Sequence, residues 1–180
     1  QVYNMNIENQ PQNSIAGNTI GGSPKVSITN FINQPLSGVD VTVYINQHGF
    51  AAGTRTVQTN AYGKAIFDNL VINEAASDYQ LIFEADHSGI SNVSSDMFDV
   101  THANPSSMSI ITQPDETTEG AAIEGPPAVK LTDDYGNAIA GEEIQVAETA
   151  GYSFDGGTTS ITTDENGHAV FSDLIINAMG

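Results

Sequence analysis

Apolar and polar side chains alternate along most of this chain with a period of two residues. Val41, Val43 and Ile45 are each separated by a more polar neighbour, and residues 79–86 show the same alternation. No segment has the 3.6-residue periodicity of an amphipathic helix. The pattern therefore predicts β-strands that each bury one face.

Short turns rich in Gly, Asn, Pro and Ser separate the predicted strands. In the first part of the chain seven strands are expected, over residues 2–9, 24–31, 39–46, 54–60, 63–72, 78–86 and 94–102. Strands of this number and spacing are typical of an antiparallel β-sandwich. Gly63 is expected to provide the positive φ that a tight connection needs, since the apolar face resumes at Ala65.

The two parts of the chain are copies of one unit. Identical residues recur at an offset of 103 between residues 5–43 and 108–146, and at an offset of 104 between residues 59–73 and 163–177. Such self-similarity is typical of repeat proteins. We therefore predict one sandwich over residues 1–103 and a second over residues 104–180.

The second copy is shorter than the first. Residues 74–102 follow Asn73 and include two predicted strands, whereas only three residues follow Asn177 in the sequence. Either further repeats follow Gly180, or the second sandwich has an open edge that can pair with a strand from another subunit. Both hypotheses predict that residues 104–180 are unstable on their own.

The charge balance excludes several classes of partner. The chain has 22 acidic and 4 basic side chains, with a formal net charge of −18. Nucleic acids and anionic membranes bind clusters of Lys and Arg, so neither is an expected partner. Disulfides and thiolate zinc sites are excluded because there is no cysteine. No apolar run approaches the ~20 residues of a membrane span.

The acidic residues are concentrated in the second copy. Residues 104–180 contain thirteen acids and one cation, against nine acids and three cations in residues 1–103. Calcium binds carboxylate and carbonyl oxygens of loops. The candidate calcium ligands are Asp133, Asp134 and Asn137 in one predicted loop, and Asp164, Glu165 and Asn166 in another. The alternative is a solvated acidic surface that keeps a secreted protein soluble, with no cofactor.

Residues 129–141 (VKLTDDYGNAIAG), followed by residues 163–171 (TDENGHAVF), resemble the bacterial immunoglobulin-like repeats of invasin- and intimin-type adhesins. The resemblance covers essentially the whole chain. Residues 133–137 (DDYGN) show the Asp-x-x-Gly-Asn loop of these repeats, whereas residues 30–35 (NFINQP) replace it in the first copy. The resemblance implies an all-β fold of two tandem immunoglobulin-like antiparallel β-sandwiches, the second lacking its last strands. Tyr79 then stands where a tyrosine corner is expected, and Leu81 where antibody domains have a cysteine.

The resemblance also implies a function. We expect a non-enzymatic structural repeat of a large secreted bacterial surface protein, serving at the cell surface as an adhesin stalk or extracellular filament. Its partners would be neighbouring repeats of the same polypeptide or other subunits of a surface assembly, and a homo-oligomer is compatible with both. Scattered histidines and the lack of nucleophile-elbow or phosphate-loop motifs predict no enzyme.

Two alternatives remain open. The first is a calcium- or carbohydrate-binding module, and the second is a self-assembling surface-layer or fibre subunit completed by strand exchange. Carbohydrate binding would need exposed aromatic side chains on which a sugar ring can stack. The candidates are Tyr44, Phe50, Tyr62, Tyr135 and Tyr152. Isolated aromatic residues more often cover the edges of a sandwich.

Overall fold

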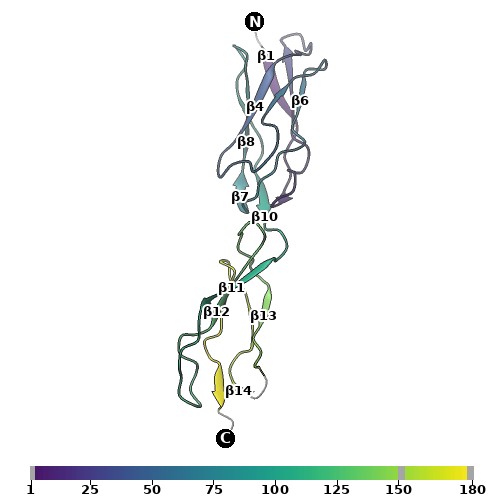
Figure 1. Cartoon of the computed structure of the whole chain (residues 1–180). Helices are drawn as coiled ribbons and strands as arrows, with labels where there is room; N and C mark the ends of the chain where they lie inside the picture. Colours follow the sequence, from purple (N-terminus) through teal and green to yellow (C-terminus); the bar gives the residue numbers. More distant parts are fainter. Residues whose placement is uncertain (1–2, 150–152, 178–180) are drawn as a thin grey trace. The chain divides into compact units, whose positions relative to one another are not determined.

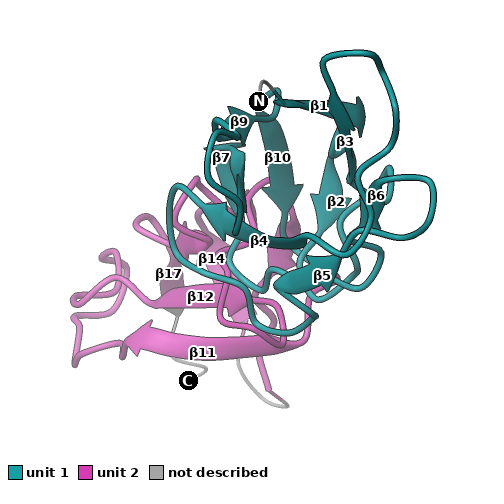
Figure 2. Ribbon diagram, turned by 90° about the horizontal axis from the view of Figure 1, so that it is seen from above, with its two compact units in different colours: residues 1–103 teal, residues 104–180 magenta. Residues whose placement is uncertain are grey.

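The regular elements of this chain are all β-strands in the residues that the structure describes. A computed structural model describes residues 3–149 and 153–177. The chain divides into two compact units, Gln1–Ala103 (unit 1) and Asn104–Gly180 (unit 2), which are coloured separately in Figure 2. None of the described segments forms a helix of the length and apolarity that crossing a membrane requires.

Unit 1 contains three sheets, with strand orders β1-β3-β6, β5-β4-β8-β9 and β2-β10-β7. Figure 1 shows the strands of this unit in purple to teal. All neighbouring strands are antiparallel except β2 and β10, which are parallel. The strands are β1 (Tyr3–Asn9), β2 (Ser14–Ile15), β3 (Lys25–Asn30), β4 (Asp40–Ile45), β5 (Thr56–Gln58), β6 (Lys64–Ile66), β7 (Ala76–Tyr79), β8 (Leu81–Ala85), β9 (Val93–Ser94) and β10 (Phe98–Thr101).

The apolar faces of these sheets share one core, as expected for a β-sandwich. On β4, Val41 and Val43 are buried while Asp40 and Tyr44 are exposed, which confirms the period-two prediction for this segment. Within the core, the ring centroids of Phe67 and Phe83 lie 5.3 Å apart.

The prediction of a single strand over residues 78–86 is wrong, because the chain changes sheets there. Strand β7 pairs with β10, whereas β8 pairs with β4. Asp78, at this change of sheet, has a φ of 62°. The side chain of Asn46 forms hydrogen bonds to the backbone on both sides of it. Its Oδ1 accepts the N–H of Gln80, and its Nδ2 donates to the carbonyl of Asp78. Tyr79 and Leu81 are both buried, so the alternation continues across the switch and conceals it.

Two other predicted strands are also interrupted. Of residues 63–72 only β6 is a strand, and the following segment brings Phe67, Leu70 and Ile72 into the core. Residues 94–102 are divided between the end of β9 and the whole of β10. The short strand β2 was not predicted, because its two residues are too few to show an alternation of apolar and polar side chains. The predicted tyrosine corner is present, since the Tyr79 hydroxyl donates to the Glu74 carbonyl at 2.8 Å.

Unit 2 repeats the first part of this fold. Its sheets have the strand orders β11-β12-β16, β13-β15 and β14-β17. The strands are β11 (Ser107–Thr112), β12 (Ala128–Thr132), β13 (Glu143–Gln145), β14 (Ser153–Gly156), β15 (Ser160–Thr162), β16 (His168–Val170) and β17 (Ile175–Asn177). Within the described residues, unit 2 has no counterparts of β7, β8, β9 and β10. The part of the second sandwich that the structure describes therefore corresponds to β1–β6 of unit 1 and the segment that follows β6.

The turns before β6 and β16 are equivalent and depend on glycine. Gly63 has a φ of 70° and Gly167 has a φ of 75°, which confirms the predicted left-handed turn. A Cβ at Gly63 would also lie 2.5 Å from the carbonyl oxygen of Ile28. Both the φ and this close approach require glycine.

Candidate functional site

The predicted calcium ligands lie in turns that occur in both units. In unit 1 the Oδ1 of Asn30 accepts the N–H groups of Ile32 and Gln34, each at 3.0 Å. At the equivalent position of unit 2, the Oδ1 of Asp133 accepts the N–H groups of Tyr135 and Asn137, each at 2.9 Å. The departure of residues 30–35 from the sequence pattern therefore leaves this pattern of hydrogen bonds unchanged.

The second predicted loop follows the same rule. The Oδ1 of Asn60 accepts the N–H groups of Tyr62 and Lys64, at 2.9 and 3.1 Å. Its counterpart Asp164 accepts the N–H groups of Asn166 and His168, at 2.9 and 2.8 Å. In these pairs an amide in unit 1 and a carboxylate in unit 2 cap the same turn.

A third pair outside the predicted sites shows the same exchange. The Oδ1 of Asn69 accepts the N–H of Thr54 at 2.9 Å, and the Oδ1 of Asp173 accepts the N–H of Thr158 at 2.8 Å. Three of the additional acids of unit 2 thus perform a structural task that amides perform in unit 1. An alignment of the two repeats contains this signal, because Asn stands opposite Asp at each position.

The six candidate ligands differ in their surroundings. Asp133 is buried, and its Oδ2 accepts a 2.8 Å hydrogen bond from the Nδ2 of Asn137. Asp134, Asp164, Glu165 and Asn166 are exposed. The two loops are neighbours within unit 2, since Leu131 donates its N–H to the carbonyl of Gly167 and accepts that of Ile139. Among the described residues, no three Asp, Glu, His or Cys side chains are grouped as a metal ion would require.

The backbone N–H donors also affect the ionisation of these carboxylates. Hydrogen bonds from the backbone of His168, and then of Asn166, hold the pKa of Asp164 below its ordinary value. The N–H and hydroxyl of Thr158 lower the pKa of Asp173 in the same way. Both carboxylates are therefore stabilised in the charged form that accepts these bonds.

The candidate sugar-stacking residues that the structure describes lie on separate elements. Tyr44, Tyr62 and Tyr135 are exposed, but Tyr44 lies on β4 whereas Tyr62 and Tyr135 lie in separate turns. Phe50 is only partly exposed and packs against the core of unit 1. Tyr152 lies outside the described residues.

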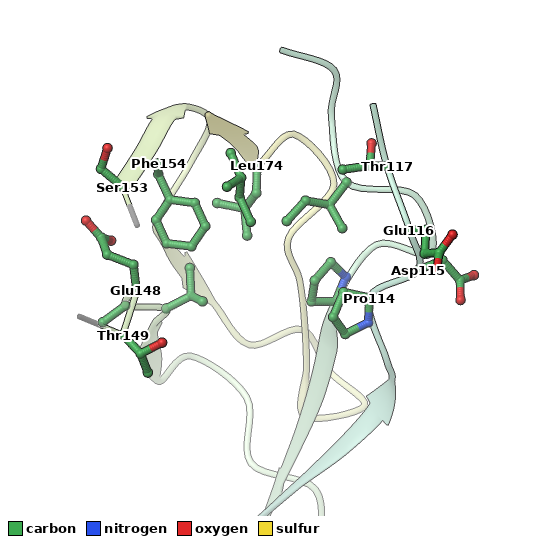
Figure 3. A pocket seen from close by; sticks show the side chains of 14 residues that line it. Pro114, Asp115, Glu116, Thr117, Glu148, Thr149, Ser153, Phe154 and Leu174 are labelled. Atoms are coloured by element: carbon green, nitrogen blue, oxygen red, sulfur yellow. The ribbon is translucent and has the colours of Figure 1, made fainter. Parts of the chain in front are cut away.

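Unit 2 contains an apolar groove of about 590 Å³. Its apolar walls are formed by Pro114, Ile123, Val146, Phe154, Leu174 and Ile176. Figure 3 shows the side chains of Phe154 and Leu174 facing that of Pro114 across the groove, while Glu148, Asp115 and Glu116 lie at its rim. An open edge in unit 2 was one of two alternatives from the sequence, which did not indicate the residues that line this groove.

Comparison with known proteins gives a likeness of fold. No protein-family model matches this chain, and no curated protein matches it either. The D0-D1 domain of intimin is similar over 95% of this chain and 83% of that chain, with 16% sequence identity and a TM-score of 0.39. A chimeric titin Z1Z2-Z1Z2 tandem is similar over 97% of this chain and 100% of that chain, with 10% identity and a TM-score of 0.26. Identities and TM-scores this low assign no function.

Proposed function

We propose that this chain is a pair of non-enzymatic structural repeats from a large secreted bacterial surface protein, in which they form part of an adhesin stalk or extracellular filament. The observation that carries the proposal is which residues the two units share. Phe67 and Phe171, like Leu70 and Leu174, are buried at equivalent positions. The shared glycines, such as Gly63, form turns. The residues that the two units share are thus those that form the core and the turns, as expected for repeats whose function is structural.

The strand arrangement of unit 1 suits a chain that is pulled from both ends. Strand β2 near the N-terminus pairs in parallel with β10, the last strand of the unit. Tension on the two ends acts on these strands in opposite directions. The hydrogen bonds between the two strands are then loaded in shear, so that they resist unfolding together. One such bond runs from the N–H of Ala16 to the carbonyl of Thr101 at 2.8 Å.

Ala16→Pro is expected to lower the force at which unit 1 unfolds, because proline has no N–H to donate to Thr101. The measurement is single-molecule pulling of the 180-residue chain between two identical handle domains. The unit 1 event is recognised by its release of about 350 Å of extended chain, at up to ~3.6 Å per residue.

Val41→Ala is the matched control, because it removes buried volume from β4 and leaves the β2–β10 pair intact. It should reduce thermal stability while changing the unfolding force less than Ala16→Pro does. An unfolding force that Ala16→Pro leaves unchanged would show that this pair does not carry tension, and would argue against the mechanical role.

The groove of unit 2 favours a second candidate function. A subunit of a surface layer or fibre would present such a groove to strands of a neighbouring subunit, which would complete its second sandwich. The stalk and the fibre both require the sandwich of unit 2 to be completed, and they differ in where the completing strands come from.

A further inference from the structure

The outer face of the sheet formed by β5, β4 and β8 in unit 1 contains a polar pocket of about 310 Å³. Val41 and Val43 of β4 are buried in the core, so the residues that alternate with them face outward. Thr42 is paired with both Thr56 and Glu84, which places these three side chains on the same face. The residues that line the pocket with a ring or a polar side chain are Asp40, Thr42, Tyr44, Thr56, Glu84 and Asp86.

Tyr44 contributes the aromatic ring of this pocket, which we call the Tyr44 pocket. Tyr44 is 50% exposed, and in the described part of the chain no other ring stacks on it. It also lines an adjoining pocket of about 220 Å³, whose polar lining includes Arg55. A ligand that lay on the ring would therefore have hydrogen-bonding groups within reach from both pockets.

The polar groups of the Tyr44 pocket are held in place by hydrogen bonds within the protein. The Oγ1 atoms of Thr42 and Thr56 lie 2.9 Å apart. The Nε2 of Gln58 donates to the Oδ1 of Asp40 at 3.2 Å, and the backbone N–H of Asp86 donates to the Asp40 carbonyl at 2.8 Å. A carboxylate has about four acceptor positions, so Asp40 can accept further hydrogen bonds. The pocket thus presents acceptors that are oriented before a ligand binds, which lowers the entropic cost of binding.

Tyr44 does not belong to the scaffold that the two units share. The equivalent residue of unit 2 is Ala147, whereas Thr56 is replaced conservatively by Ser160, which pairs with Gln145 as Thr56 pairs with Thr42. The backbone of this face therefore forms in unit 2 without a tyrosine. A side chain that the repeated fold does not require, exposed beside a pocket, is where a function can be added to a scaffold.

The lining of the Tyr44 pocket limits the class of ligand. An apolar ligand would bury carboxylates and hydroxyls without partners, and an anion would be repelled by the three acids. No three acidic or histidine side chains among the described residues are grouped closely enough for a metal ion. An ammonium ion would be attracted by the carboxylates but repelled by Arg55 in the adjoining pocket. A neutral sugar fits each part of the lining, because its hydroxyls donate to carboxylates and its C–H face packs on an aromatic ring.

We propose that this face of unit 1 binds a neutral oligosaccharide. One pyranose ring stacks its C–H face on Tyr44, and its hydroxyls donate to the carboxylates of Asp40 and Glu84. The next ring extends into the pocket that Arg55 lines. Rings whose hydroxyls are equatorial, as in β-1,4-linked glucose or N-acetylglucosamine, present the flat C–H face that such stacking needs. The inference goes beyond the proposed structural role and does not depend on it.

The test is an NMR titration of the 180-residue chain with cellotetraose and, separately, with tetra-N-acetylchitotetraose, each to about 10 mM. We expect at least one tetrasaccharide to cause saturable shifts at backbone amides of β4, β5 and β8. Tyr44→Ala gives unit 1 the residue that unit 2 has, and it should weaken binding roughly tenfold or more. Tyr62→Ala is the matched control, because it removes a ring that is 75% exposed in a turn outside the pocket. This variant should bind as the original chain does.

Salt and a cationic probe separate a sugar site from a site for organic cations. Sugar binding should not change when the sodium chloride concentration is raised, whereas binding of a cation to the carboxylates would weaken. Spermidine should leave the amides around Tyr44 unshifted.

Three results would overturn the proposal. They are no saturable shift with either tetrasaccharide, sugar binding that Tyr44→Ala leaves unchanged, and salt-sensitive binding of spermidine that competes with the sugar. The last result would identify an organic cation as the ligand. Sugar binding tests the Tyr44 pocket and Ala16→Pro tests the mechanical role, so either proposal can fail while the other stands.

Discussion

Phe83→Ala is expected to lower the free energy of unfolding of unit 1 by about 3–5 kcal/mol, the usual cost of removing a buried phenylalanine ring. Phe83 is fully buried, its ring contacts that of Phe67, and it lies on β8 next to Val43 of β4. Small domains have only about 5–15 kcal/mol of stability, so this single change removes a substantial part of the stability of unit 1. Urea denaturation followed by NMR of unit 1 amides measures the effect.

Phe31→Ala is the control for this substitution. It removes the same ring from an exposed position in the turn that Asn30 caps, where the side chain is 63% exposed. We expect a change within about 0.5 kcal/mol, as for most surface substitutions. If the two variants lose similar stability, the ring of Phe83 is not in the core of unit 1 and the described packing is wrong.

Asp133→Ala is expected to destabilise unit 2 by about 2–3 kcal/mol. The substitution leaves the N–H groups of Tyr135 and Asn137 without their acceptor, and unsatisfied donors of this kind cost about 1–3 kcal/mol. Because Asp133 is buried, water replaces the lost acceptor poorly. The measurement is the urea midpoint of unit 2 in the full chain.

Asp133→Asn separates turn capping from metal binding. An amide caps the equivalent turn at Asn30, so this variant should keep most of the stability that Asp133→Ala loses. The calcium hypothesis predicts a different pattern, in which millimolar calcium raises the melting temperature of the original chain and Asp133→Asn removes that gain. A calcium-dependent gain of this kind would contradict capping as the main task of Asp133.

Much of the fold could be predicted from the sequence because its signals are local. Alternation in residues 39–46 identifies β4, and the glycines at 63 and 167 mark turns that need a positive φ. The change of sheet between β7 and β8 could not be predicted in this way. It depends on hydrogen bonds from Asn46, more than thirty residues earlier in the chain, while the alternation itself continues unbroken.

The candidate site was predicted less well, because a list of acidic residues does not show what each carboxylate binds. Asp133 and Asp164 satisfy backbone donors of their own turns, which is a matter of local geometry. The groove of unit 2 results from the packing of distant segments, and only the comparison with Val43 and its neighbours in unit 1 shows which residues line it.

Amide hydrogen exchange at Val43 and Val146 tests the central claim, that β4 of unit 1 lies between two strands whereas the equivalent β13 pairs with β15 alone among the described residues of unit 2. The two amides are equivalent and both are hydrogen-bonded, Val43 to the Arg55 carbonyl at 2.8 Å and Val146 to the Thr159 carbonyl at 2.9 Å. Val43 lies between β5 and β8, and we expect it to exchange only when unit 1 unfolds globally. Val146 should exchange by local opening, at least 100-fold faster. Equal protection of the two amides, or slower exchange at Val146, would contradict the claim.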